Sequence, residues 1–276
     1  MRYYGGHQGW YSIDLDVNRK PTESHFAVNL SAEAEDLDFK EAAYYTARLI
    51  SKNYDNLYVG MSGGLDSEFI AEVLYNNNIQ FTPIIVVRID STDHQRAIDW
   101  CKSRSITYLT VKFDQSDLAR ISMKLAKESK LYFSNYTIIY YLAEIVGNTG
   151  GLIVGEPTIG NDDNDSSPIG NVFGMHYGSF ILDIFFPGQH PGAFFMYTPE
   201  LLLAYTKYLN TALSDSESRA ILYEIPHRPK FEPMLHKQKL IDNISYINEL
   251  DQYSQIPNGH HVLFDKQELI DRLTGL

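Results

Sequence analysis

Two serines, two glycines and an aspartate stand together in the stretch Ser-Gly-Gly-Leu-Asp-Ser at residues 62–67, directly after an apolar run. Glycines allow backbone N–H groups to approach a ligand closely, because they carry no Cβ. A helix that begins here would add its free N–H groups and the positive end of its dipole. Such a loop, with serine hydroxyls as further donors, can hold phosphate oxygens. The lysine of the Walker A loop is missing, so the sequence predicts a phosphate loop of another type.

Strands and helices alternate around this loop. Helical patterns of apolar residues separate four runs that we expect to be strands, at 57–61, 81–89, 106–113 and 150–156, and we expect the first two to be buried. This alternation predicts an α/β fold with a parallel sheet and helices on both of its faces. The carboxyl ends of parallel strands meet at one edge of a sheet, where open α/β sheets bind ligands.

The flanking segments differ from this pattern. Residues 11–17 and 25–30 alternate between apolar and polar side chains on either side of a turn, which predicts a short antiparallel pair. We therefore expect an N-terminal β-hairpin at 1–37, an α/β core at 38–190, and a C-terminal helical part at 191–276 packed on the core. The helices expected in the last part are 199–213, 216–223, 234–252 and 265–273. Helix starts are indicated by Asp38 with Glu41, by Thr198 before Pro199, and by Asp265 with Glu268.

Two segments near the fourth strand allow more than one interpretation. Residues 155–178 are dense in Gly, Asn, Asp, Ser and Pro, which predicts a long irregular loop of the kind that often carries function. Residues 191–200 are rich in aromatic side chains, which either line an acceptor-substrate pocket or belong to the core.

Composition narrows the class of protein. The formal net charge is −12, which opposes binding to a phosphate backbone and makes a nucleic-acid partner unexpected. A single cysteine, Cys101, excludes an intramolecular disulfide and a multi-cysteine zinc site. No apolar run approaches the length of a membrane helix, and no secretory signal is visible near the start, so we expect a cytoplasmic protein without a membrane partner.

The stretch Ser-Gly-Gly-Leu-Asp-Ser, placed between a buried strand and a helix, resembles the signature of the PP-loop ATP pyrophosphatase superfamily, which includes asparagine synthetase and NAD synthetase. The resemblance covers residues 38 to about 160 and implies a Rossmann-like fold of the adenine nucleotide alpha hydrolase type. It implies a reaction in which an acceptor oxygen attacks the α-phosphorus of ATP, giving an adenylated substrate and pyrophosphate. Ammonia or an amine then displaces AMP.

The resemblance also implies roles for particular residues. The loop residues would hold the β- and γ-phosphates, and Asp66 would serve both catalysis and an Mg²⁺ ion. These loop residues are Ser62, Gly63, Gly64, Asp66 and Ser67. The ends of the first two strands would receive adenine at Gly60, Met61, Val87 and Arg88, although Arg88 is equally well interpreted as a surface cation.

Further candidates lie later in the chain. Gly155 and Glu156 resemble the acidic turn after the fourth strand, with an ordinary exposed turn as the alternative. Asp162 and Asp163 are candidate Mg²⁺ ligands or simply solvated acids. Arg228 and Lys230 could neutralise the leaving pyrophosphate as catalytic cations, with a basic surface turn as the alternative.

We therefore expect an AMP-forming synthetase that uses ATP and Mg²⁺ and acts on a small-molecule carboxyl or amide oxygen. The chain has no cysteine pattern of a glutaminase domain, so ammonia or an amine would come free or from a separate glutaminase. The resemblance to this superfamily also implies a homodimer. The alternatives are a tRNA-type base-modifying ligase, which the acidic charge opposes, and an ATP/AMP-binding module without catalysis.

Overall fold

The computed structural model describes eight ranges of the chain: 1–16, 26–88, 94–129, 136–155, 159–160, 172–176, 180–226 and 261–275. Its centre is a sheet of five parallel strands in the order β10-β7-β4-β5-β6. The strands are β4 (Leu57–Gly60), β5 (Thr82–Arg88), β6 (Leu109–Phe113), β7 (Gly151–Val154) and β10 (Gly192–Ala193). The four predicted strands are confirmed. The sequence did not indicate β10, because two residues carry no periodic pattern.

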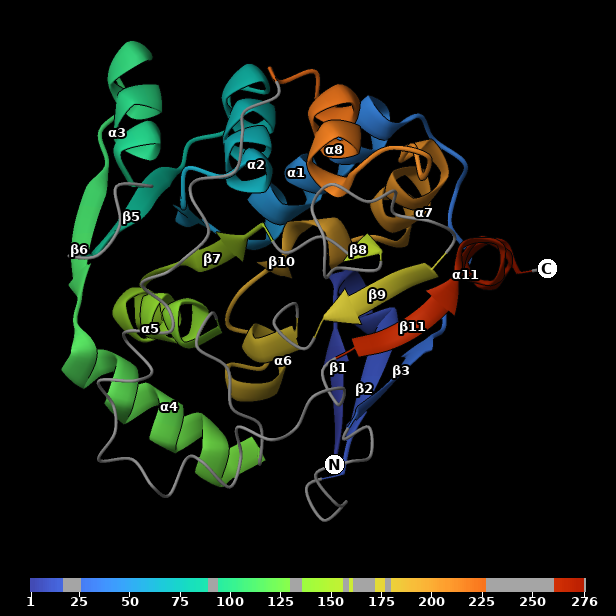
Figure 1. Ribbon diagram of the computed structural model, residues 1–276, viewed down its shortest axis with the longest axis horizontal. Coiled ribbons are helices and arrows are strands. Elements are labelled where there is room, and N and C mark those ends of the chain that lie inside the picture. Colours follow the sequence, from blue (N-terminus) through green and yellow to red (C-terminus); the bar gives the residue numbers. More distant parts are fainter. Residues whose placement is uncertain are drawn as a thin grey trace.

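Helices cover both faces of the sheet, as predicted (Figure 1). Helices α1 (Phe39–Asn53), α2 (Leu65–Asn76) and α3 (His94–Ser103) lie on one face, and α4 (Gln115–Ser129) and α5 (Tyr136–Val146) lie on the other. The start of α1 is fixed by the Asp38 side chain, which accepts a hydrogen bond of 2.8 Å from the Glu41 N–H. The helix buries Phe39, Ala43 and Ile50 at helical spacing.

The N-terminal part is a three-stranded antiparallel sheet of β1 (Arg2–Gly5), β2 (Tyr11–Leu15) and β3 (Phe26–Leu30). The predicted pair is thus confirmed and extended by β1. On β2 the predicted alternation holds, since Tyr11, Ile13 and Leu15 are buried while the residues between them are half-buried. This apolar face joins the same continuous core as the central sheet.

A second antiparallel sheet, in the order β11-β9-β8, corrects the expectation of an irregular loop at 155–178. Its strands are β8 (Ile159–Gly160), β9 (Val172–His176) and β11 (His261–Asp265). Gly174 on β9 pairs with Leu263 on one side and Ile159 on the other. The glycine- and asparagine-rich composition concealed these strands. The C-terminal part therefore contributes a strand as well as helices.

The C-terminal helices are α6 (Ile181–Phe185), α7 (Pro199–Tyr208), α8 (Asp215–Tyr223) and α11 (Lys266–Thr274). Thr198 caps α7 through the Leu201 N–H, with Pro199 in the first turn, as predicted. Asp265 caps α11 through the Gln267 N–H, two residues on. Helix α7 ends five residues earlier than expected, and the predicted helix 234–252 lies outside the described residues.

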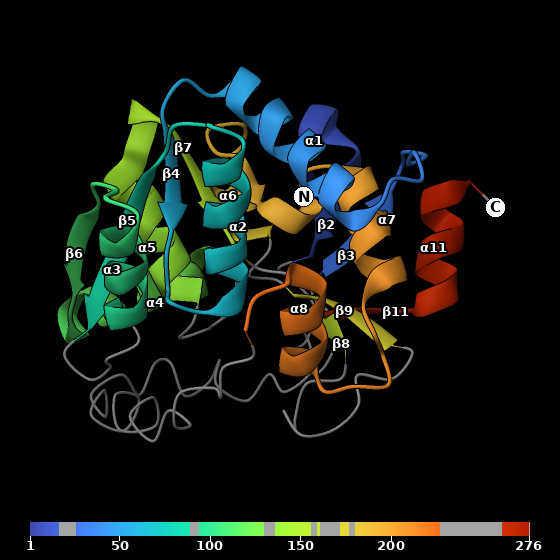
Figure 2. The same ribbon diagram turned by 90° about the horizontal axis from the view of Figure 1, so that it is seen from above.

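Helices α7 and α8 pack on α1 and α2 respectively (Figure 2). Stacked aromatic rings hold this junction together: Tyr223 of α8 lies 4.4 Å from Phe69 of α2 and 5.9 Å from Phe39 of α1, between ring centroids. Helix α8 is therefore anchored beside the beginning of α2. The domain boundaries at residues 37 and 190 stay a prediction.

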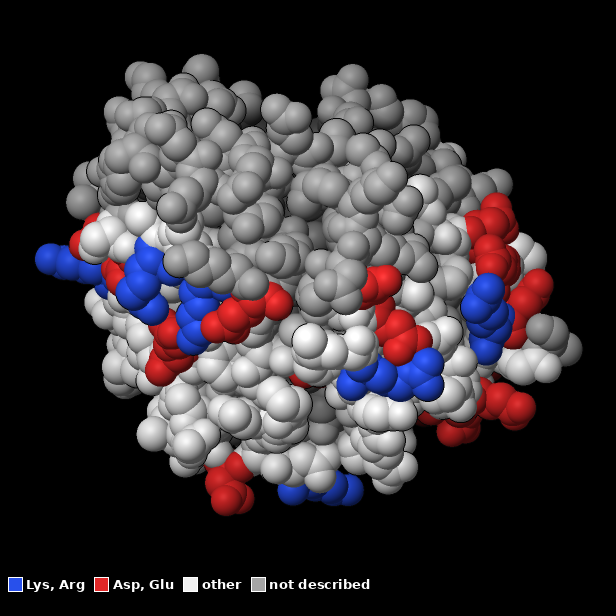
Figure 3. All heavy atoms as spheres, turned by 90° about the horizontal axis from the view of Figure 1, so that it is seen from below, with Lys and Arg blue, Asp and Glu red and all other residues white. Residues whose placement is uncertain are grey.

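The surface carries charges of both signs. Figure 3 shows Lys and Arg side chains interspersed with Asp and Glu over the described part of one face. None of the helices in the described part of the chain has the length and apolarity needed to cross a membrane.

Candidate functional site

The glycine loop lies between β4 and α2, as the sequence predicted. The Met61 N–H donates to the Ile84 carbonyl at 3.0 Å, which extends the ladder between β4 and β5 to the mouth of the loop. Gly63 then adopts a φ of +83°, a conformation that favours glycine. Gly64 is the N-cap residue of α2.

The N-terminus of α2 is open. Gly64 offers no side chain, and no side-chain cap is found at this helix in the described part of the chain. The first helical hydrogen bond runs from the Glu68 N–H to the Gly64 carbonyl at 3.1 Å. The N–H groups of the first turn, at residues 65–67, therefore have no partner within the helix. Together with the helix dipole they form an anion-binding position.

The two serines of the loop have different environments. The Ser67 hydroxyl donates to the Gly64 carbonyl at 3.1 Å and accepts from the Ser62 N–H at 3.3 Å. Ser67 is only 3 % exposed, so its hydroxyl fixes the shape of the loop. Ser62 is exposed, and its hydroxyl oxygen accepts from the Gly64 N–H at 3.3 Å and lies 3.3 Å from the Ser67 hydroxyl.

Asp66 is held by two residues of α8 that the sequence analysis did not identify. Its Oδ2 accepts from Arg219 Nη1 at 2.6 Å, and its Oδ1 accepts from the Tyr223 hydroxyl at 2.8 Å. Arg219 also forms an ion pair with Asp215 one turn before it. The spacing of Asp215 and Arg219 was visible in the sequence, but nothing in the sequence connects them to a loop about 150 residues away.

This network is buried and charged. The Arg219 side chain is 9 % exposed, and the Asp66 side chain is 16 % exposed. Burial opposes the charge on Arg219, but Asp66 and Asp215 outweigh it and raise the pKa of Arg219 well above its usual value. Arg219 therefore stays protonated and offsets part of the negative charge of Asp66 and Asp215 behind the loop.

Gly155 at the end of β7 packs directly on the loop. A Cβ at this position would lie 2.9 Å from Asp66 Cβ and 3.1 Å from the Ser67 nitrogen. The predicted meeting of the first and fourth strand ends is thus observed for Gly155. Only glycine fits there without moving the backbone of α2.

Gly155→Ala is expected to lower the free energy of unfolding by about 1–3 kcal/mol, because the added methyl group forces the loop backbone to shift. Urea denaturation measures this loss. Gly147→Ala is the control: Gly147 has a φ of +51° and no atom within 4 Å of an added Cβ, so it tests backbone strain alone. Binding of ATP should weaken in Gly155→Ala and stay unchanged in Gly147→Ala. Equal ATP binding by both variants would contradict the role given to Gly155.

The other nucleotide candidates are arranged as follows. Gly60 and Met61 of β4 lie beside β5, which carries Val87 and ends at Arg88, so the structure brings these positions to the same edge as the loop. Met61 is 2 % exposed and its N–H donates to the Ile84 carbonyl, so little of this residue is open to adenine. The positions of Glu156, Asp162, Asp163, Arg228 and Lys230 lie outside the described residues.

The loop offers few metal ligands of its own. Within the described residues, no group of three or more His, Cys, Asp or Glu side chains could enclose a metal ion. Asp66 is the carboxylate of the loop, and both of its oxygens already accept hydrogen bonds. A single carboxylate fits Mg²⁺, which is commonly held by one or two carboxylates together with substrate phosphates and water.

The aromatic segment 191–200 belongs to the core. Phe194, Phe195 and Met196 have no exposed surface. The core interpretation of this segment is therefore confirmed for these side chains, and they do not line an acceptor pocket.

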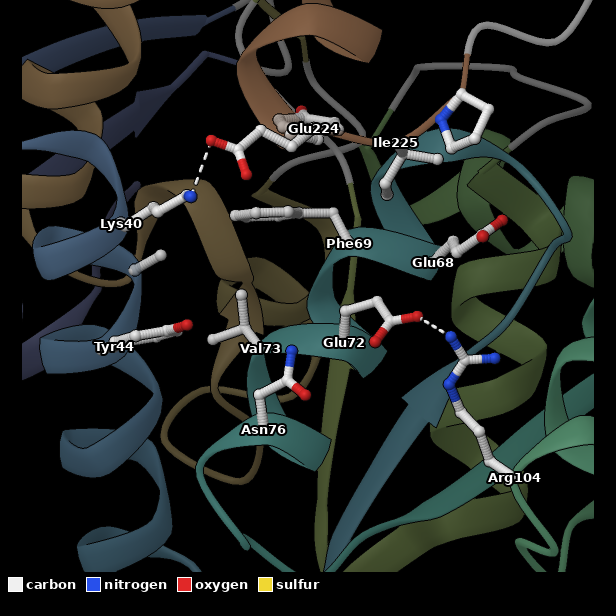
Figure 4. Close-up of a pocket in the computed structure, with 13 residues that line it drawn as sticks. Lys40, Tyr44, Glu68, Phe69, Glu72, Val73, Asn76, Arg104, Glu224 and Ile225 are labelled. Atoms are coloured by element: carbon white, nitrogen blue, oxygen red, sulfur yellow. Dashed lines mark hydrogen bonds and ion pairs between the residues drawn. The ribbon is translucent and has the colours of Figure 1, made fainter.

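A cavity of about 380 Å³ lies between α1, α2 and the end of α8 (Figure 4). Lys40 pairs with Glu224 on one side of it, and Arg104 pairs with Glu72 on the other. Tyr223 lines this cavity and also binds Asp66, which links the cavity to the loop. Because these lining charges pair with one another, they do not define the charge of a ligand.

The fold and the loop define an α/β protein with a glycine loop between strand β4 and the uncapped helix α2, at the carboxyl edge of its sheet. No known family profile and no curated protein matches the sequence. Among solved structures, the chain is similar to NMN synthetase from Francisella tularensis, at 18% identity over 44% of this chain and 56% of that chain, with a TM-score of 0.34. It is also similar to a predicted subunit of tRNA methyltransferase from Methanocaldococcus jannaschii, at 16% identity over 37% of this chain and 53% of that one, with a TM-score of 0.29. The matched part thus spans little more than half of either structure, and likeness at this level says nothing about function.

Proposed function

We propose that this chain binds ATP at the glycine loop and is an AMP- and pyrophosphate-forming synthetase of the PP-loop type. The observation that carries the proposal is the uncapped N-terminus of α2 behind the Ser-Gly-Gly-Leu-Asp-Ser loop. Unpaired N–H groups at a helix N-terminus favour a phosphate group. The sequence of the loop, which resembles the PP-loop signature, favours a pyrophosphate over other anions.

In this proposal the loop binds the leaving group. The N–H groups of Gly63 and the first turn of α2 would donate to oxygens of the β- and γ-phosphates. The Gly64 N–H and the Ser62 hydroxyl would exchange their mutual hydrogen bond for the same oxygens. An oxygen of the acceptor attacks the α-phosphorus, and the bond from that phosphorus to the bridging oxygen of the β-phosphate breaks. Pyrophosphate leaves with the electron pair, and the loop donors stabilise the charge that develops on it.

The second half of the reaction needs a nitrogen nucleophile. Ammonia or an amine attacks the activated carbon of the acceptor, and the carbon–oxygen bond to AMP breaks, with AMP leaving as the anion. The nitrogen would come free or from a separate glutaminase. The acceptor is proposed to be a small molecule with a carboxyl or amide oxygen.

Asp66, Arg219 and Tyr223 would give the loop its shape and charge. Arg219 and Tyr223 fix the carboxylate of Asp66 beside the first turn of α2. Bound Mg²⁺ would neutralise phosphate charge, with Asp66 as its protein ligand. Glu156, Asp162, Asp163, Arg228 and Lys230 remain proposed partners of the metal or the phosphates.

The runner-up is a nucleic-acid-modifying enzyme with the same loop. Such an enzyme needs a basic surface to hold the phosphate backbone. The described part of the face in Figure 3 carries mixed charges, and the chain as a whole has a net charge of −12, so a small-molecule acceptor is favoured.

The proposal is tested by incubating the protein with ATP, Mg²⁺, ammonium and a panel of small carboxylates, and separating the nucleotide products. AMP and pyrophosphate in equal amounts are the expected products. Release of ADP and phosphate would overturn the proposed bond cleavage. Tight binding of ATP without turnover of any acceptor would instead favour the non-catalytic ATP-binding module.

A further inference from the structure

A second cavity lies at the opposite ends of the strands. It has a volume of about 330 Å³ and is lined by Asp183, His190, Tyr54 and Tyr197, among others. Strand β7 runs between the two sites: a Cβ on Gly151 would meet Tyr54 and Pro191, whereas Gly155 packs against Asp66. The four residues of β7 separate these ends by about 13 Å of strand.

Asp183 is the charged side chain that makes this cavity unusual. It is 6 % exposed, and its Oδ2 accepts from the Tyr11 hydroxyl at 2.7 Å. Its Oδ1 has no hydrogen-bond or ion-pair partner among the residues that the structure describes. No lysine or arginine lines the cavity in the described residues. A buried carboxylate without a cation is costly, and it is relieved either by a proton or by a cation from outside.

The buried titratable groups around the cavity do not supply this cation. His190 accepts the Leu152 N–H at its Nδ1, at 3.3 Å, and burial lowers its pKa, so the ring is neutral. Tyr54 and Tyr197 have pKa values raised by burial and stay uncharged. Burial likewise raises the pKa of Tyr11. The side chains of His7 and Tyr4 also line the cavity.

We propose that this cavity binds a small organic cation, with the ammonium group of a primary amine against Oδ1 of Asp183. The lining favours an alkylammonium over a metal ion. Ca²⁺ takes six to eight oxygen ligands, and Mg²⁺ held by a single carboxylate relies on substrate phosphates and water. This cavity offers one carboxylate among the amides of Gln8 and Asn53 and tyrosine and histidine rings. Aromatic rings attract an ammonium group by cation–π interaction and pack against its alkyl chain. This site is independent of the ATP chemistry proposed above.

Calorimetric titration with n-propylammonium chloride at pH 8, in a potassium chloride background, tests the proposal. We expect saturable binding to the unaltered protein, and binding at least about tenfold weaker for 1-propanol, which lacks the charge. Asp183→Asn keeps the size of the side chain and an oxygen for Tyr11, and should weaken amine binding by at least about tenfold. Asp99→Asn removes an exposed carboxylate on α3, away from both cavities, and should leave amine binding unchanged.

The pH dependence gives a second test that needs no variant. Burial raises the pKa of Asp183 to about 7. The cation binds only the ionised form, so amine binding should be about tenfold weaker at pH 6 than at pH 8, while 1-propanol shows no such change. Equal binding to Asp183→Asn, equal binding of 1-propanol, or displacement of the amine by equimolar potassium would each overturn the proposal. Absence of any amine binding would overturn it as well.

Discussion

Replacement of Asp66 by asparagine is expected to reduce ATP-dependent pyrophosphate release by at least about 100-fold. The change keeps the size and shape of the side chain. An asparagine can still accept from Arg219 through its oxygen and donate to the Tyr223 hydroxyl through its amide, so the loop keeps its position. What is lost is the negative charge beside the phosphates, which would hold Mg²⁺ and balance Arg219.

The measurement is the initial rate of pyrophosphate release with saturating ATP and the acceptor found for the unaltered protein. Asp99→Asn is the matched control, because Asp99 is an exposed carboxylate on α3 that accepts a hydrogen bond from Gln95. That control should keep its full rate. An Asp66→Asn variant that is folded and fully active would show that the catalytic site lies elsewhere.

Replacement of Arg219 by methionine is expected to lower the free energy of unfolding by about 3–5 kcal/mol. Arg219 is the shared partner of Asp66 and Asp215, and its side chain is 9 % exposed. Methionine fills a similar volume but removes the cation that Asp66 and Asp215 share. The loss of one partner from a buried network costs far more than the net value of the pair, because the remaining charge stays buried.

Urea denaturation in the absence of ATP measures this loss. Arg272→Met is the matched control: Arg272 pairs with Glu268 at the same four-residue spacing on α11, but both side chains are 49 % exposed. Exposed helix pairs of this kind contribute at most about 0.5 kcal/mol. Similar losses in the two variants would mean that burial of the Arg219 network adds nothing to stability.

Much of the fold could be predicted from the sequence because its signals are local. The strands β4, β5 and β7 of the central sheet have apolar runs, and the helix starts at Asp38, Thr198 and Asp265 have side chains that cap them. The strands β8 and β9 were missed because glycine and asparagine dominate their surroundings. Their pairing partner β11 lies far along the chain, so the ladder has no local signature.

The candidate site was predictable only as far as its residues are contiguous. The loop, its place before α2 and the approach of Gly155 follow from the motif and from the geometry of parallel strands. The contacts of Asp66 with Arg219 and Tyr223 depend on how α8 packs on α2 through stacked aromatic rings. Such packing is decided by the whole core, and no spacing in one sequence reveals it.

The link between Asp66 and Arg219 also has a consequence for the newly made chain. The two residues are 153 positions apart, so a ribosome that has just completed the loop has not yet made its cation. At synthesis rates of about 5–20 residues per second, the wait is roughly 8–30 s. During this interval Asp66 stays solvated, and the loop has its glycines but not its final charge. The newly made chain would therefore become able to bind a nucleotide only late, when α8 docks.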